Sequence, residues 1–240
     1  MNAVSQSLEL ERAAVVENFD SKGLEVDIIL PPDPKGVVLL VHGSGSSRLS
    51  PRNRFVARML RERGLGTMLF DAETTEEREH SLEAGKSSIG LAELARRIVL
   101  ATDWIQTDEH FVGLRIGYLG SGTGGAAAFM AAAERPDVVR AIVTRGARLE
   151  LAHSCLPRVK APALLIVGAR DTPVFHHNRD ALLMLGSESK RLEIIPGARH
   201  TFEEPGTLAA VAMHAGTWLA RHLCLHPDPA SSHAVVRKDS

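Results

Sequence analysis

The feature that most constrains the fold of this chain is a glycine-rich turn between a short apolar strand and an Ala-rich helix. Residues 115–119 (RIGYL) are typical of a buried strand, and residues 126–134 (AAAFMAAAE) are typical of a helix. Between them lies the sequence Gly120-Ser121-Gly122-Thr123-Gly124. A turn this tight, with a glycine at each end, lifts its central residue above the edge of a sheet. That central residue is Gly122, which has no side chain.

Strands and helices alternate along the rest of the chain. Apolar runs predict strands at 24–30, 36–41, 65–71, 138–144, 163–167 and 191–195. Apolar residues three or four apart predict helices at 52–63, 89–106, 178–185 and 206–223. Residues 72–88 are charged and have no clear period, which favours a connection with a helical turn. This order predicts an α/β fold, a mainly parallel sheet with helices on both faces.

Length and composition place the chain among ordinary α/β domains. Its 240 residues fit one domain over 1–225, followed by a flexible tail over 226–240. The formal net charge of −1 gives no general attraction to nucleic acid or to anionic membranes. The N-terminal residues do not resemble a signal peptide, and no apolar run approaches the roughly 20 residues that cross a bilayer. We therefore expect a cytoplasmic protein with no nucleic-acid or membrane partner, of unknown oligomeric state.

The histidines and cysteines indicate neither a metal site nor a disulfide framework. Eleven histidines are scattered without the spacing of a zinc site. The two cysteines, Cys155 and Cys224, are interpreted as reduced thiols.

Two polar residues follow strands in the order expected of a catalytic acid and base. Asp171 comes just after the strand at 163–167, and His200 lies in the loop before the last helix. A histidine can take a proton from an attacking group, while a carboxylate fixes its tautomer. Each residue also has a purely structural interpretation: Asp171 could cap the next helix, and His200 could bind a backbone carbonyl. Their order after the glycine turn favours the catalytic interpretation.

Backbone and charged groups complete the hypothetical site. An oxyanion would need two backbone N–H donors, which we assign to Thr123 and to Ser44 in the loop after the strand at 36–41. Arg48 and Arg145 could hold an anionic group of a ligand near the same edge.

Taken together, the stretches at 38–60, 116–152, 164–185 and 196–208 resemble the dienelactone-hydrolase-like branch of the α/β-hydrolase superfamily. The resemblance implies an α/β-hydrolase fold and hydrolysis of a small carboxylic ester, thioester or lactone through an acyl-enzyme, with no metal and no organic cofactor. Asp171 and His200 match the acid and base of the family, whereas Gly122 departs from its serine or cysteine nucleophile. The chain is therefore expected to be nearly inactive in that chemistry.

Several explanations of Gly122 stay open at the level of sequence. The glycine could be an engineered substitution, a natural change in a scaffold that now binds a ligand or performs acid–base chemistry through His200, or the mark of a structural or regulatory relic. Ser121, Thr123 or a water molecule could also replace the missing nucleophile.

A dinucleotide site is the competing interpretation of the same turn. Residues 120–125 (GSGTGG) satisfy G-x-G-x-x-G between a strand and a helix. However, the acidic residue expected about 20 residues later is absent. Thr144 and Arg145 stand there instead, and this interpretation leaves Asp171 and His200 without a role.

Overall fold

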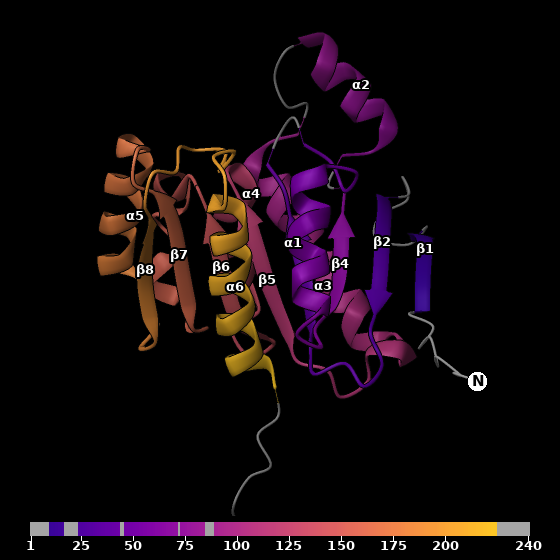
Figure 1. Cartoon of the computed structure of the whole chain (residues 1–240). Coiled ribbons are helices and arrows are strands. Elements are labelled where there is room, and N and C mark those ends of the chain that lie inside the picture. The colour runs from indigo at the N-terminus through magenta and orange to yellow at the C-terminus, as the bar shows by residue number, and fades with distance from the viewer. Residues whose placement is uncertain (1–9, 17–23, 44–45, 72, 85–88, 225–240) are drawn as a thin grey trace, which may run out of the picture.

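An eight-stranded sheet forms the centre of the molecule (Figure 1). The computed structural model describes residues 10–16, 24–43, 46–71, 73–84 and 89–224. The strands are β1 (Leu10–Val16), β2 (Leu24–Leu30), β3 (Val37–Val41), β4 (Gly66–Phe70), β5 (Ile116–Ser121), β6 (Val139–Arg145), β7 (Ala163–Gly168) and β8 (Lys190–Ile195). Their order is β1-β2-β4-β3-β5-β6-β7-β8, and all neighbours are parallel except the pairs β1–β2 and β2–β4. The predicted mainly parallel sheet is confirmed.

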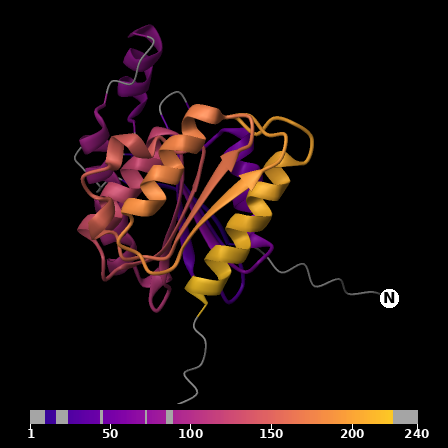
Figure 2. The ribbon, with the colours of Figure 1, turned by 90° about the vertical axis from the view of Figure 1, so that its left-hand side faces the viewer.

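Helices cover both faces of this sheet, as the sequence predicts. They are α1 (Pro51–Arg61), α2 (Thr75–Ala84), α3 (Leu91–Thr107), α4 (Thr123–Glu134), α5 (Thr172–Met184) and α6 (Thr207–Leu223). Helices α1 and α6 lie on one face of the sheet, and α3, α4 and α5 lie on the other (Figures 1 and 2). The buried side chains form one apolar core on each face. None of the helices in the described part of the chain is long and apolar enough to cross a membrane.

The prediction for residues 72–88 is wrong, because much of this segment is the regular helix α2. Thr74 and Glu77 form a reciprocal capping box: the Glu77 N–H donates to Thr74 Oγ1 over 3.2 Å, and the Thr74 N–H donates to Glu77 Oε2 over 2.9 Å. The helix has no apolar stripe, so a search for helical periodicity misses it. The T-x-x-E pattern is the signal that could have found it. In Figure 1, α2 stands out from the rest of the molecule.

The structure also differs from the prediction at one strand and one helix. The sequence analysis does not predict strand β1, and α5 begins at Thr172 rather than at residue 178. The tail predicted at 226–240 lies outside the described residues.

A buried arginine ties α2 to the body of the molecule. Arg97 on α3 is 2% exposed, and its guanidinium binds both Glu77 on α2, over 2.6 and 2.8 Å, and Glu93, over 2.8 Å. Charged groups taken out of water are stable only when paired, so this cluster depends on all three members.

We predict that Arg97→Met lowers the free energy of unfolding by about 2–3 kcal/mol, because it leaves partly buried carboxylates without their counter-charge. The matched control is Arg96→Met, which removes a neighbouring guanidinium that is 49% exposed and binds the same Glu93. That change should cost less than about 1 kcal/mol. Urea denaturation measures both values, and equal destabilisation by the two variants would contradict the prediction.

Candidate active site

The turn between β5 and α4 presents Gly122 in a conformation that side chains rarely adopt. Gly122 has φ 55° and ψ −126°, and a methyl group added there would meet no atom within 4 Å. The flanking glycines have no such space. A methyl group on Gly120 would lie 2.5 Å from Cα of Gly125, and one on Gly124 would lie 2.5 Å from the carbonyl oxygen of His42. The turn therefore requires glycine on either side of a central position that is open.

Asp171 and His200 form a hydrogen-bonded pair beside this turn. Nδ1 of His200 donates to Oδ2 of Asp171 over 2.6 Å, which leaves Nε2 as the basic atom of the ring. Asp171 occupies the N-cap position of α5, but its side chain makes no capping hydrogen bond. The carboxylate thus binds the imidazole instead of the helix. The pair has the arrangement of a base and its orienting acid.

The segment after β6 connects the histidine to the turn. Gly146 has φ 54°, and a methyl group there would lie 3.4 Å from both Nδ1 and Cε1 of His200. Two residues later, the N–H of Arg148 donates to the carbonyl oxygen of Gly122 over 3.1 Å. The imidazole ring and Gly122 are therefore held by the same short stretch of chain.

The start of α4 lies beneath the loop that follows β3. Thr123 is the first residue of α4, and a methyl group on Gly43 would lie 3.1 Å from its backbone nitrogen. Gly43 therefore packs against the first turn of α4, and a larger residue there would crowd the Thr123 N–H that the sequence analysis assigns to an oxyanion. Ser44, the predicted second donor, lies outside the described residues.

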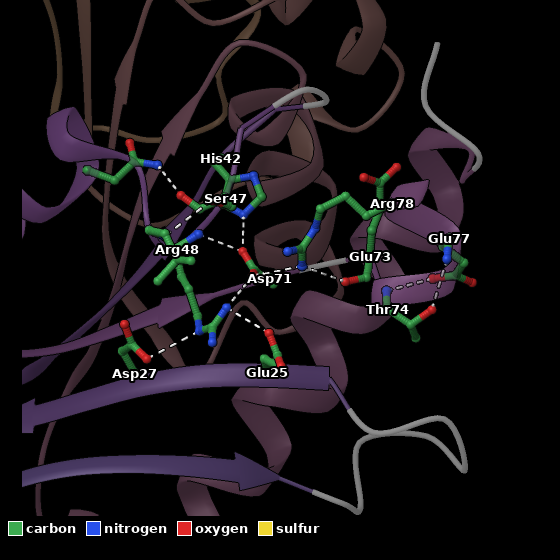
Figure 3. A network of polar contacts seen from close by, with 12 residues as sticks. Glu25, Asp27, His42, Ser47, Arg48, Asp71, Glu73, Thr74, Glu77 and Arg78 are labelled. Atoms are coloured by element: carbon green, nitrogen blue, oxygen red, sulfur yellow. Dashed lines mark hydrogen bonds and ion pairs between the residues drawn. The ribbon is translucent and has the colours of Figure 1, made fainter. Parts of the chain in front are cut away.

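Arg48 does not contribute a free charge to the site. Its guanidinium binds Glu25 over 2.7 Å, Asp27 over 3.2 Å and Asp71 over 2.9 Å (Figure 3). Three carboxylates satisfy this arginine, so its predicted role in binding an anionic ligand is not carried further.

Asp71 is the centre of a network that sequence reasoning missed. Its side chain is 1% exposed and accepts hydrogen bonds from Nε2 of His42, from the N–H and guanidinium of Arg48, and from the guanidinium of Arg78 (Figure 3). His42 and Arg48 stand on either side of the loop after β3, so one carboxylate fixes both ends of that loop. The signal that could have found this network is the position of both residues at strand ends. Asp71 follows β4 and His42 follows β3, and these strands are parallel neighbours, so the two side chains lie at the same edge of the sheet.

The network also sets the ionisation of Asp71. Burial by itself would raise the pKa of this carboxyl group, but the hydrogen bonds from His42 and Arg48 and the charge of Arg78 outweigh it and lower the pKa below its usual value. A lowered pKa means that the ionised group stabilises the fold above its unfolded-state pKa, and that this contribution is lost as the pH falls through the native pKa.

We predict that Asp71→Asn destabilises the protein by about 2–4 kcal/mol at neutral pH, because buried donors lose a charged acceptor. Its stability should also fall less steeply than that of the unsubstituted chain as the pH drops from about 5. The control is Asp27→Asn, which removes a carboxylate that is 22% exposed and also binds Arg48. Denaturation curves between pH 3 and 8 test this, and identical pH dependence with and without Asp71 would refute it.

Arg145 ends β6, directly opposite Ser121 in the sheet register. It is 8% exposed, and its Nη2 donates to Oδ1 of Asn53 over 2.9 Å. Burial, together with the charge of Arg52, lowers the pKa of Arg145 to about 10, so the side chain remains charged at neutral pH.

The geometry does not favour the dinucleotide interpretation of residues 120–125. The carbonyl of His42 lies against Gly124, so the chain at the end of β3 packs closely against the first turn of α4, where a pyrophosphate would bind. Among the described residues, no cluster of three or more His, Cys, Asp or Glu side chains is arranged to hold a metal ion.

Comparison with known proteins points to one family. A family model described as the dienelactone hydrolase family matches residues 54–222. Among solved structures, a dienelactone hydrolase from Anabaena variabilis is 49% identical, with a TM-score of 0.86, covering 90% of this chain and 99% of that one. Est1E from Butyrivibrio proteoclasticus shares the fold, with 14% identity, a TM-score of 0.72 and coverage of 89% and 98%.

A curated relative carries a different name. A Mycobacterium tuberculosis protein, named provisionally as a phosphoribosyl transferase, is 45% identical over 197 residues. The match covers 82% of this chain but only 43% of that protein, so the chain spans less than half of its length.

Proposed function

Because this chain belongs to the dienelactone hydrolase family, we propose that its site is built for hydrolysis of a small carboxylic ester, thioester or lactone and lacks only the nucleophile. The observation that carries the proposal is the His200–Asp171 pair, at 2.6 Å, beside a strained turn whose central position is open. A phosphoribosyl transferase activity is not carried over, because that name belongs to a relative more than twice as long as the matched part.

Each group has a definite role in the proposed chemistry. Nε2 of His200 takes the proton of the attacking group and later delivers it to the leaving group. Asp171 holds the neutral tautomer of the ring and stabilises the imidazolium. The Thr123 N–H, at the positive end of α4, stabilises the oxyanion that forms as the carbonyl carbon becomes tetrahedral.

Gly122 removes the acyl-enzyme route from this mechanism. A hydroxyl at this position would attack the carbonyl and split hydrolysis into two easier steps. Without it, a water molecule activated by His200 is the remaining nucleophile that these groups can use. Loss of the nucleophile from a catalytic triad lowers kcat by about 10⁶-fold, so the chain as it stands should hydrolyse esters very slowly. Ser121 and Thr123 are poor substitutes, because adjacent side chains on a tight turn point in different directions.

We predict that Gly122→Ser raises the rate of p-nitrophenyl acetate hydrolysis by at least about 10³-fold, because its hydroxyl would enter the open space beside His200. The matched control is Gly122→Ala, which adds the Cβ atom without the hydroxyl and should leave the rate unchanged. Both variants should lose about 1–3 kcal/mol of stability, since φ 55° strains any residue other than glycine.

Two further measurements make this test decisive. A covalent serine probe should label Gly122→Ser and should fail to label Gly122→Ala. Adding His200→Asn to Gly122→Ser should abolish most of the gained activity. If the serine variant folds and shows neither turnover nor labelling, the hydrolase proposal fails, and the same scaffold is better described as a ligand-binding or acid–base protein.

A further inference from the structure

Arg145 is a buried arginine whose charge has no acidic partner in the described part of the chain. Its one side-chain hydrogen bond goes to the neutral amide of Asn53. By contrast, the buried Arg97 binds two carboxylates and the largely buried Arg48 binds three. A buried, uncompensated charge is costly, so it is usually found where a ligand supplies the opposite charge.

The rest of the Arg145 guanidinium is not completely enclosed. The completely enclosed side-chain nitrogens and oxygens that lack a partner among the described residues belong to other residues. The nitrogens of Arg145 that do not bind Asn53 therefore keep a small exposed area within a residue that is only 8% exposed, and a ligand would contact them there.

Helix α1 adds a second positive feature at the same place. Asn53, the acceptor for Arg145, lies in the first turn of α1, and its Nδ2 is fixed by the carbonyl oxygen of Ser47 at 3.1 Å. The N-cap residue Ser50 makes no side-chain capping hydrogen bond, and the first turn holds no acidic residue. The N-terminus of a helix carries a partial positive charge and N–H groups without intrahelical acceptors; in α1 the first residue, Pro51, has no N–H, so these donors are the N–H groups of Arg52 and Asn53. Arg145 is thus held against an uncapped helix start.

This positive corner adjoins the candidate active site. Gly146, the residue after Arg145, packs against the His200 ring. Arg52 in the first turn of α1 binds Glu203, three residues after His200, over 2.8 Å. The Arg52–Glu203 pair is exposed on both sides, at 39% and 68%, and such pairs are weak.

We infer that Arg145, Arg52 and the N-terminus of α1 bind a phosphate group of the substrate, so that the site takes a phosphorylated ester or lactone. That the phosphate belongs to a substrate rests on the proposed function, whereas the phosphate-binding site does not depend on it. A phosphate carries a charge of about −1.5 to −2 and three acceptor oxygens, which suits two guanidinium groups and a helix start better than a single carboxylate does.

The test uses the chain with Gly122 in place, so that binding is measured without turnover. Inorganic phosphate, acetate and chloride are titrated at constant ionic strength, and binding is followed by calorimetry and by the shift in Tm. Phosphate should bind and raise Tm, while acetate and chloride should have at least about tenfold weaker effects. Equal binding of acetate and phosphate would overturn the assignment to phosphate.

Arg145→Met should weaken phosphate binding by about tenfold or more, because it removes the buried guanidinium. Arg140→Met is the matched control: it removes the same charge from the exposed, opposite end of β6 and should change the affinity by less than twofold. If Arg145→Met does not fold, as judged by urea denaturation, Arg52→Met replaces it, since that side chain is 39% exposed, and a reduction of about threefold or more is expected.

Two further outcomes overturn the inference: no phosphate binding by the unsubstituted chain, or equal binding by the arginine variants and the control. These results are separate from the test of hydrolysis. If phosphate binding depends on Arg145 but the Gly122→Ser variant shows no hydrolysis, the proposed phosphate site stands and the proposed hydrolase function fails.

Discussion

The site depends on one packing constraint, the close approach of the start of α4 to the chain around it. A methyl group on Gly124 would overlap the His42 carbonyl, and one on Gly125 would lie 2.5 Å from Cβ of Ala147. Only glycine at positions 124 and 125 allows the helix to approach His42 and Ala147 this closely. Because the start of α4 lies so close to His42 and Ala147, the segments after β3 and β6 both reach the turn at Gly122. The segment after β6 also contacts the His200 ring through Gly146. The open space at Gly122 is therefore a vacancy for a side chain within an otherwise closely packed region.

Charge is distributed around this turn in two contrasting ways. Asp71 lies in a network where each of its oxygens has at least one charged or N–H donor, and that network fixes the loop beside the turn. Arg145, on the other side, is also buried, but among the described residues its side chain binds only the amide of Asn53. The first arrangement stabilises the fold and leaves no capacity to bind a ligand. The second leaves electrostatic energy that only an added anion can recover. Burial alone therefore does not separate structural from functional charges, whereas the identity of their partners does.

The sequence predicts those parts of the fold and site that follow from local pattern. Glycine spacing identifies the turn, and chain order identifies Asp171 and His200 before either is placed in space. The Asp71 network could not be predicted, because it joins residues from β2, two loops and α2 that become neighbours only through sheet register. Helix α2 escapes periodicity analysis because tertiary contacts through Arg97, and not an apolar face, hold it. For Arg48 and Arg145 the sequence gives the same residue type near the same edge, and only the surrounding carboxylates distinguish them.

The position of Asp171 offers its carboxylate two alternative partners, the first turn of α5 and His200. An aspartate at the N-cap of a helix would normally bind the free N–H groups of the first turn, which stabilises a protein by about 1 kcal/mol. Here the carboxylate turns to His200 and leaves α5 without a side-chain cap. The His200 side chain is 51% exposed but that of Asp171 is only 11% exposed, so the histidine is also the partner of a largely buried carboxylate. The His200–Asp171 bond thus takes the place of a side-chain cap on α5, and the same bond orients the imidazole as the proposed mechanism requires.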